Sequence, residues 1–364
     1  MPKNIIVCCD GTGNQFDESY SNVVKIFTII KKDQTQLAYY DPGVGTLNDE
    51  SAAGLPGKWR KVKSLAFGSG LEKNVKEAYS YLMENYHNGD QLFLFGFSRG
   101  AFTVRVLAGF IHQVGILEKG CQNLIPYAWD TYRKTTNKTG QELAAEFRTT
   151  FSRTATIHFL GLWDTVTSMG LFNWRRYPNT TNNGSVVHIR HAISIDERRT
   201  FFRQNLFGAY HADGTVKQVW FVGVHADVGG SYPFNESGLA QVALQWMAKE
   251  AKGLALAIDE EQETMVLYDQ TGHNSPPDYR GEIHPSLSGA WKLLEYIPRV
   301  KLQPFRLMSP GRGRPRELFH DAKGEPCKPT IHQSVKDRIN DQALGYKPLN
   351  LTDEQLKVCE TEPW

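Results

Sequence analysis

A serine flanked by glycines, in the stretch 96–100 (GFSRG), is the feature of this sequence that points most directly to chemistry. The apolar run 92–95 precedes it, and apolar residues with helical spacing follow it from 101 to 111. A serine between a strand and a helix occupies a strained turn that exposes its hydroxyl, and the glycines let neighbouring backbone approach closely. The pattern predicts that Ser98 is the nucleophile of an acyl-transfer reaction.

A serine nucleophile needs a base, and the base needs an acid that orients it. Asp164 follows the apolar run 157–162, and His225 follows the run 219–224. The carboxyl ends of parallel strands line one crevice, so these side chains are expected to meet Ser98 there. The chain order serine, aspartate, histidine is the order found in α/β-hydrolases. The predicted catalytic set is therefore Ser98, Asp164 and His225.

Two other residues compete for the roles of acid and base. Asp227 lies two residues beyond His225 and is an alternative acid. His332 is an alternative base supplied by a later loop, because the histidine follows the last strand in many α/β-hydrolases. The residues alone leave both alternatives open.

An acyl-transfer site also needs backbone donors for the developing oxyanion. The turn 10–14 (DGTGN) ends the first apolar run, and its glycines permit close approach of the backbone. The predicted donors are the N–H groups of Gly11 and Thr12, together with that of Arg99. A phosphate-binding loop is less favoured, since no GK[ST] or full GxGxxG follows, and a plain tight turn is the other alternative.

Short apolar runs alternate with helical patterns along the chain, as in a parallel sheet wrapped by helices. The runs are 5–9, 37–40, 92–95, 157–162 and 219–224. Apolar spacing over 71–86 predicts a helix that Asn88-Gly89 ends, and the same spacing recurs at 239–247. The predicted fold class is α/β, of the α/β-hydrolase kind, with a mostly parallel sheet covered by helices on both faces.

Two segments depart from the alternation within one predicted domain, 1–364. Residues 170–210, with the tip NTTNNG at 179–184, are predicted to form a cap-like insertion, a surface excursion without function being the alternative. Residues 275–364 are predicted to be an irregular C-terminal extension. Its stretch 306–316 contains four arginines and two prolines, which indicates a solvated loop or, alternatively, contact with an anionic surface.

The charge balance and the cysteines exclude several classes of protein. The 41 basic and 39 acidic side chains give no nucleic-acid footprint. The five cysteines include no CxxC pair, so they are expected to be reduced thiols, and no metal or organic cofactor is predicted. Without a leader or an apolar run of about 18 residues, the chain is expected to be cytoplasmic, with signal-less export as the alternative.

Six motifs together resemble the α/β-hydrolase-like domain family shared with phospholipase effectors of bacterial type VI secretion. They run in order from residue 9 to residue 230, as segments 9–14, 40–46, 96–101, 161–166, 191–198 and 224–230. The resemblance implies an α/β-hydrolase fold, a Ser-Asp-His triad and hydrolysis of lipid esters. Its motifs place the family's nucleophile on Ser98 and its acid and base on Asp164 and His225.

The leading functional prediction is a serine hydrolase that cleaves carboxylic esters, in particular lipid or phospholipid acyl esters. Its expected partners are an ester or lipid substrate and, transiently, a membrane surface; no particular protein partner is indicated. One alternative is a non-catalytic α/β-hydrolase-like binding module, which a broken triad would favour. Another is a different acyl-group enzyme, such as a thioesterase, peptidase or acyltransferase, because the same triad serves all of them.

Overall fold

The structure is a computed structural model. It describes residues 2–11, 19–43, 69–166, 177–208, 215–268, 275–289, 291–292, 295–296, 299–302, 305–308 and 312–364. The helices are α1 (Asn22–Ile29), α3 (Ser69–Asn85), α4 (Arg99–Val114), α5 (Ile125–Lys134), α6 (Lys138–Phe151), α7 (His225–Gly229), α8 (Gly238–Lys252), α9 (Glu260–Tyr268), α11 (Gln333–Asn340) and α12 (Asp353–Val358). Short 3₁₀ turns are η2 (Gln122–Leu124), η3 (Thr200–Phe202) and η4 (Phe234–Glu236).

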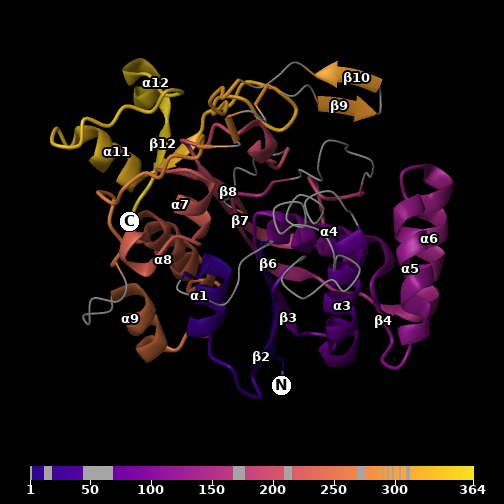
Figure 1. Cartoon of the computed structure of the whole chain (residues 1–364). Helices are drawn as coiled ribbons and strands as arrows, with labels where there is room; N and C mark the ends of the chain where they lie inside the picture. Colours follow the sequence, from indigo (N-terminus) through magenta and orange to yellow (C-terminus); the bar gives the residue numbers. More distant parts are fainter. Residues whose placement is uncertain are drawn as a thin grey trace, which may run out of the picture.

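The centre of the molecule is an eight-stranded sheet in the order β12-β11-β8-β7-β6-β3-β1-β2 (Figure 1). Every neighbouring pair in this sheet is parallel. The strands are β1 (Asn4–Cys9), β2 (Gln36–Asp41), β3 (Gln91–Phe97), β6 (Ile157–Trp163), β7 (Val186–Ser194), β8 (Val216–Phe221), β11 (Thr330–His332) and β12 (Glu360–Glu362). Two antiparallel pairs join β4 (Ile116–Leu117) to β5 (Ser152–Arg153) and β9 (Arg299–Leu302) to β10 (Phe305–Met308). The predicted α/β class and mostly parallel sheet are confirmed.

Helices cover both faces of the sheet, because alternate residues of a strand point to opposite faces. Ile5 and Val7 of β1 belong to a buried cluster that includes side chains of α3, α4, α5 and α6. Ile6 and Cys8 of the same strand belong to a second cluster, with α1, α8 and α9. Figure 1 shows these two groups of helices on opposite sides of the sheet. The prediction of two covered faces is confirmed.

The order in which the chain adds strands to the sheet reverses at β1: β2 pairs on one side of it, and β3 pairs on the other. In an open parallel sheet, ligands bind in the crevice outside the carboxyl ends of the strands at such a reversal. Gly11 follows β1 at this end, and Ser98 follows β3. The topology therefore places the GFSRG serine beside the reversal point.

The segment 170–210, expected as a cap-like or surface insertion, contains a strand of the main sheet. Residues 186–194 form β7, which pairs with β6 on one side and β8 on the other. Buried polar residues interrupt its apolar run: Arg190, His191 and Ser194. Periodicity therefore did not separate this strand from a loop. Residues 167–176 and 209–214, at either end of the segment, lie outside the described residues.

The expected irregular extension, 275–364, supplies β11 and β12 to one edge of the sheet. Ile331, Val335 and Leu351 pack there against Trp220 and other apolar side chains of the sheet. These strands are three residues long, too short for a periodic signal. The segment is thus partly regular, and it is packed into the fold.

Candidate active site

Ser98 occupies the turn between β3 and α4 with a backbone conformation that few non-glycine residues adopt. Its φ is 59° and its ψ is −120°. Its N–H donates to the carbonyl oxygen of Trp163 on β6 at 3.0 Å, which ties the turn to the next strand. Strained residues of this kind persist only where the surroundings fix them, and they cluster at active sites.

The glycines of the GFSRG stretch are required by close packing around the turn. A Cβ on Gly100 would lie 2.1 Å from the carbonyl oxygen of Cys9 and 2.5 Å from that of Asp10. A Cβ on Gly96 would lie 2.6 Å from the Cα of Ala101. The end of β1 therefore lies directly against the start of α4, where a side chain would push the two elements apart.

Gly100→Ala is expected to lower the free energy of unfolding by about 1–3 kcal/mol, because its Cβ collides with backbone that cannot rotate away. Chemical denaturation measures this loss. Gly184→Ala is the matched control: its added Cβ would meet only His112, at 4.0 Å, so its unfolding free energy should change by less than about 0.5 kcal/mol. Equal effects of the two substitutions would contradict the packing argument.

The structure brings Ser98, His225 and Asp164 into one hydrogen-bonded chain. Ser98 Oγ lies 2.8 Å from His225 Nε2, and His225 Nδ1 lies 2.5 Å from Asp164 Oδ2. Ser98 and His225 are 8% and 5% exposed, while Asp164 is buried. Such distances are those of a nucleophile, a base and an orienting acid. Phe97 and Phe202 pack on the imidazole, each with its ring centre 4.7 Å from that of His225.

Asp164 is held by donors on every side. It has a φ of 41°, and its Oδ1 accepts from the N–H and the hydroxyl of Ser194, at 2.9 and 3.1 Å. Arg316 donates to Oδ1 at 2.5 Å and to Oδ2 at 3.0 Å. Burial alone would raise the pKa of Asp164, but the charge of Arg316 and the contact with His225 hold it well below its usual range. Asp164 is therefore an ionised acceptor.

The turn that carries His225 is fixed by three acidic side chains in succession. The N–H of Gly223 donates to Asp196 at 2.7 Å, that of Val224 to Asp227 at 2.9 Å, and that of His225 to Glu197 at 3.2 Å. Gly223 has a φ of 104°, which ends the strand. The predicted run 219–224 therefore extends past β8, because its last residues form this turn.

Burial lowers the pKa of His225, more than its contact with Asp164 raises it. A lowered pKa keeps the imidazole neutral near pH 7, with Nδ1 donating to Asp164 and Nε2 open as an acceptor. This is the protonation state in which a histidine can accept a proton from a serine hydroxyl.

Asp227, the alternative acid, has no hydrogen bond with the imidazole of His225 among the described residues; it contacts His284 and the backbone of Val224. Its Oδ1 lies 2.7 Å from His284 Nδ1, and its Oδ2 accepts from the N–H of Val224. His284 Nε2 in turn lies 3.1 Å from Glu236 Oε2. The structure therefore places Asp227 where it shapes the turn before His225.

His332, the alternative base, caps the start of α11. Its Nδ1 lies 2.9 Å from the hydroxyl of Ser334, and its ring stacks on Phe221 with the ring centres 4.7 Å apart. Burial lowers the pKa of His332 to about 4. Among the described residues it has no hydrogen bond with Ser98, so the structure does not bring it into the constellation.

The predicted oxyanion donors fall into three different situations. The N–H of Gly11 already donates to the side chain of Asp10, at 2.6 Å. Thr12 lies outside the described residues. Arg99 is the first residue of α4, where a backbone N–H has no partner within the helix. Of the three, Arg99 is the donor whose position next to Ser98 suits an oxyanion.

Sequence reasoning missed Arg316, which is 1% exposed and contacts the predicted acid. Its stretch, 306–316, is rich in arginine and proline, which are usually exposed, so the sequence indicates a solvated loop there. Periodicity carries no signal for a single buried arginine in an irregular segment. Ser194 and Glu197 were also missed, although 191–198 was among the matching motifs.

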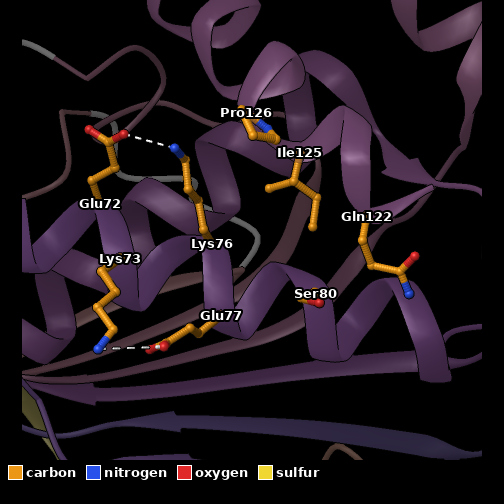
Figure 2. Close-up of a pocket in the computed structure, with 8 residues that line it drawn as sticks. All are labelled: Glu72, Lys73, Lys76, Glu77, Ser80, Gln122, Ile125 and Pro126. Atoms are coloured by element: carbon orange, nitrogen blue, oxygen red, sulfur yellow. Dashed lines mark hydrogen bonds and ion pairs between the residues drawn. The ribbon is translucent and has the colours of Figure 1, made fainter. Parts of the chain in front are cut away.

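A separate surface groove of about 600 Å³ lies between α3 and α5. Two ion pairs run along α3 at this groove, Lys76–Glu72 with an N–O distance of 2.8 Å and Lys73–Glu77 with one of 3.8 Å. Figure 2 shows both pairs. None of the three residues of the hydrogen-bonded chain lines it. The groove is therefore distinct from the candidate active site.

In the parts of the chain that the structure describes, no three histidine, cysteine, aspartate or glutamate side chains gather in a way that could hold a metal ion. No helix among the described residues combines the length and the apolarity needed to cross a bilayer.

Comparison with known proteins gives a family match and a curated relative. The family described as "T6SS, Phospholipase effector Tle1-like, catalytic domain" matches residues 3–250. The protein YEL023C of Saccharomyces cerevisiae, described as uncharacterized, is 36% identical over an alignment of 222 positions, which covers 56% of this chain and 33% of that protein. The chain thus spans about a third of the length of this relative.

Two solved structures are also similar. One is an uncharacterized protein from Pseudomonas aeruginosa, with 18% identity, a TM-score of 0.41, and coverage of 75% of this chain and 49% of that one. The other is the Tle1 effector bound to the VgrG spike from the Type 6 secretion system, with 19% identity, a TM-score of 0.36, and coverage of 65% and 52%. In each case about half of the solved chain is matched.

Proposed function

We propose a function for this chain, which belongs to the family of T6SS, Tle1-like phospholipase effector catalytic domains. The proposed activity is hydrolysis of carboxylic esters of lipids, phospholipid acyl esters in particular. Ser98 is the proposed nucleophile, His225 the base and Asp164 the acid that orients the base.

One observation carries this proposal: the hydrogen-bonded chain from Ser98 through His225 to Asp164. Its members follow three different strands, β3, β6 and β8, whose carboxyl ends share one edge of the sheet. A non-catalytic module would not need the serine hydroxyl, the imidazole and the carboxylate in this order and at these distances. The complete chain therefore favours an enzyme over a binding module.

The reaction proceeds in two halves. Ser98 Oγ attacks the acyl carbon while its proton passes to His225 Nε2, and the tetrahedral intermediate collapses when the histidine returns this proton to the leaving alcohol. Water then attacks the acyl-enzyme, His225 takes its proton, and the carboxylic acid leaves as the proton returns to Ser98. Asp164 holds Nδ1–H throughout and stabilises the transient imidazolium.

The backbone N–H of Arg99 is the proposed oxyanion donor, with Thr12 as its proposed partner. Arg99 begins a helix of sixteen residues, so the positive end of the helix dipole adds to its N–H. Transient contact with a membrane surface is proposed as the way in which a lipid substrate reaches the site.

Labelling of the purified protein with a fluorophosphonate, followed by a substrate panel, tests the function. The label is expected on Ser98. The panel compares phospholipid vesicles, a short-chain ester, an acyl thioester and a peptide amide, and kcat/KM is expected to be highest for one of the esters. A folded protein that takes no label would instead support a binding module. Preference for the thioester or the amide would place it among the other acyl-group enzymes.

A further inference from the structure

Arg316 makes a set of contacts that no step of the proposed reaction uses. Its two terminal nitrogens both donate to the Asp164 carboxylate, at 2.5 and 3.0 Å, in the forked geometry that favours guanidinium and carboxylate pairs. Nη1 also donates to the hydroxyl of Ser194 at 2.7 Å, and Nη2 donates to the carbonyl oxygen of Phe202. Its side chain is almost completely buried.

Arg316 therefore links Asp164, the proposed acid, to Phe202, whose ring packs on the proposed base. Asp164 bonds the imidazole of His225, and the ring of Phe202 packs on that same imidazole. One guanidinium thus fixes the carboxylate and, through the backbone of Phe202, the ring beside His225. This residue lies beyond the family match, which ends at residue 250.

We propose that Arg316 is a positioning residue of the hydrolase, which shares the Asp164 carboxylate with His225 and thereby sets both the orientation of the acid and the pH range of activity. This proposal rests on the proposed function. Arg316 does not touch the reacting atoms; it acts through Asp164.

The charged and titratable groups around Asp164 and His225 together determine the pH at which His225 is protonated. Asp164 faces His225, Arg316 and His191; burial lowers the pKa of His191 to about 3, so it is neutral. His225 faces Asp164, Glu197 and Arg199, and Glu197 is paired with Arg199 at 2.8 Å. Arg316, whose charge also lowers the pKa of Glu197, is therefore, among the described residues, the buried cation that is hydrogen-bonded to Asp164.

Removal of Arg316 should shift the pKa of His225 in one direction. The charge of Asp164 favours the imidazolium form of His225, and Arg316 offsets part of that charge. Without Arg316, His225 is protonated more easily and its pKa rises. The low-pH limb of kcat/KM, which reports the loss of the neutral base, then moves to higher pH.

The experiment compares pH profiles of kcat/KM on a short-chain ester for the wild type, Arg316→Gln, Arg316→Lys and Arg338→Gln. Arg316→Gln removes the positive charge, so the low-pH limb of its profile should move to higher pH by about one pH unit. Arg316→Lys keeps the positive charge but loses the forked pair of donors. The low-pH limb should therefore stay at the same pH, while the plateau value of kcat/KM falls roughly 10- to 100-fold. Melting temperatures of all variants check folding.

Arg338 is the matched control. It is also a buried arginine from the C-terminal segment, and it donates to the carbonyl oxygens of Tyr279 and Gly281 without contact to Asp164. Arg338→Gln should lower the melting temperature and leave the low-pH limb in place. A low-pH limb that shifts equally in Arg316→Gln and Arg338→Gln would make Arg316 merely structural and overturn the proposal.

The outcomes also separate this proposal from the proposed function. A wild type that neither takes the fluorophosphonate nor cleaves any ester refutes the function itself. An active wild type with unchanged pH profiles and plateaus in both Arg316 variants refutes only the role of Arg316. If Arg316→Gln does not fold, Arg316→Lys decides: a lowered plateau supports the proposal, and an unchanged plateau overturns it.

Discussion

Ser98→Ala is expected to lower kcat/KM for a short-chain ester by a factor on the order of 10⁶. The substitution removes one oxygen from a turn that its surroundings already fix: the N–H of residue 98 still donates to Trp163. The fold should therefore persist, with a melting temperature close to that of the wild type. Steady-state hydrolysis and thermal unfolding measure the two quantities on the same preparation.

Ser237→Ala is the control for this substitution. Ser237 is also a buried serine, and its hydroxyl donates to the carbonyl oxygen of Phe234 at 2.8 Å, away from the candidate site. Its alanine variant should retain ester hydrolysis. Near-normal hydrolysis by folded Ser98→Ala would remove the central claim of a serine mechanism.

His225→Ala should abolish fluorophosphonate labelling of Ser98 and lower ester hydrolysis by a similar factor, on the order of 10⁶. A serine without an adjacent base is a poor nucleophile near neutral pH. His332→Ala should label at the wild-type rate, since His332 contacts Ser334 and Phe221 at the start of α11. Labelling rates measured by gel fluorescence or intact mass compare the two variants directly.

The reverse result would exchange the assignments. If His332→Ala loses labelling while His225→Ala keeps it, the base comes from the C-terminal segment, and the contact between Ser98 and His225 is structural. Both variants should be compared only after their melting temperatures show that each is folded, because both histidines are buried.

The fold was predictable where apolar runs were continuous. β1, β3 and β6 are apolar along nearly their whole length, since helices cover both of their faces. β7 was not predicted, because Arg190 and His191 are buried within it, and buried polar side chains break the pattern on which periodicity relies. The short strands of the C-terminal segment are held by long-range pairing, which no local signal reports.

The members of the constellation were predictable for a geometric reason. Each follows a strand, and parallel strands bring their carboxyl ends together whatever the length of chain between them. What the sequence could not reveal is the set of groups that hold the constellation. Arg316 reaches Asp164 from an irregular segment. Asp196 and Glu197 accept hydrogen bonds from the backbone N–H groups of Gly223 and His225. Contacts of this kind leave no periodic trace.

The spread of the candidate site along the chain also bears on when the proposed activity would appear during folding. Ser98 and His225 are 127 residues apart, and Asp164 and Arg316 are 152 apart. Contacts between such distant residues form late, because the intervening chain must first be closed into a loop. If the proposed mechanism holds, a partly folded chain therefore contains an unactivated serine, and on a ribosome Ser98 emerges long before His225, its proposed base. Recovery of fluorophosphonate labelling during refolding should thus lag behind the recovery of helical structure, as measured by circular dichroism.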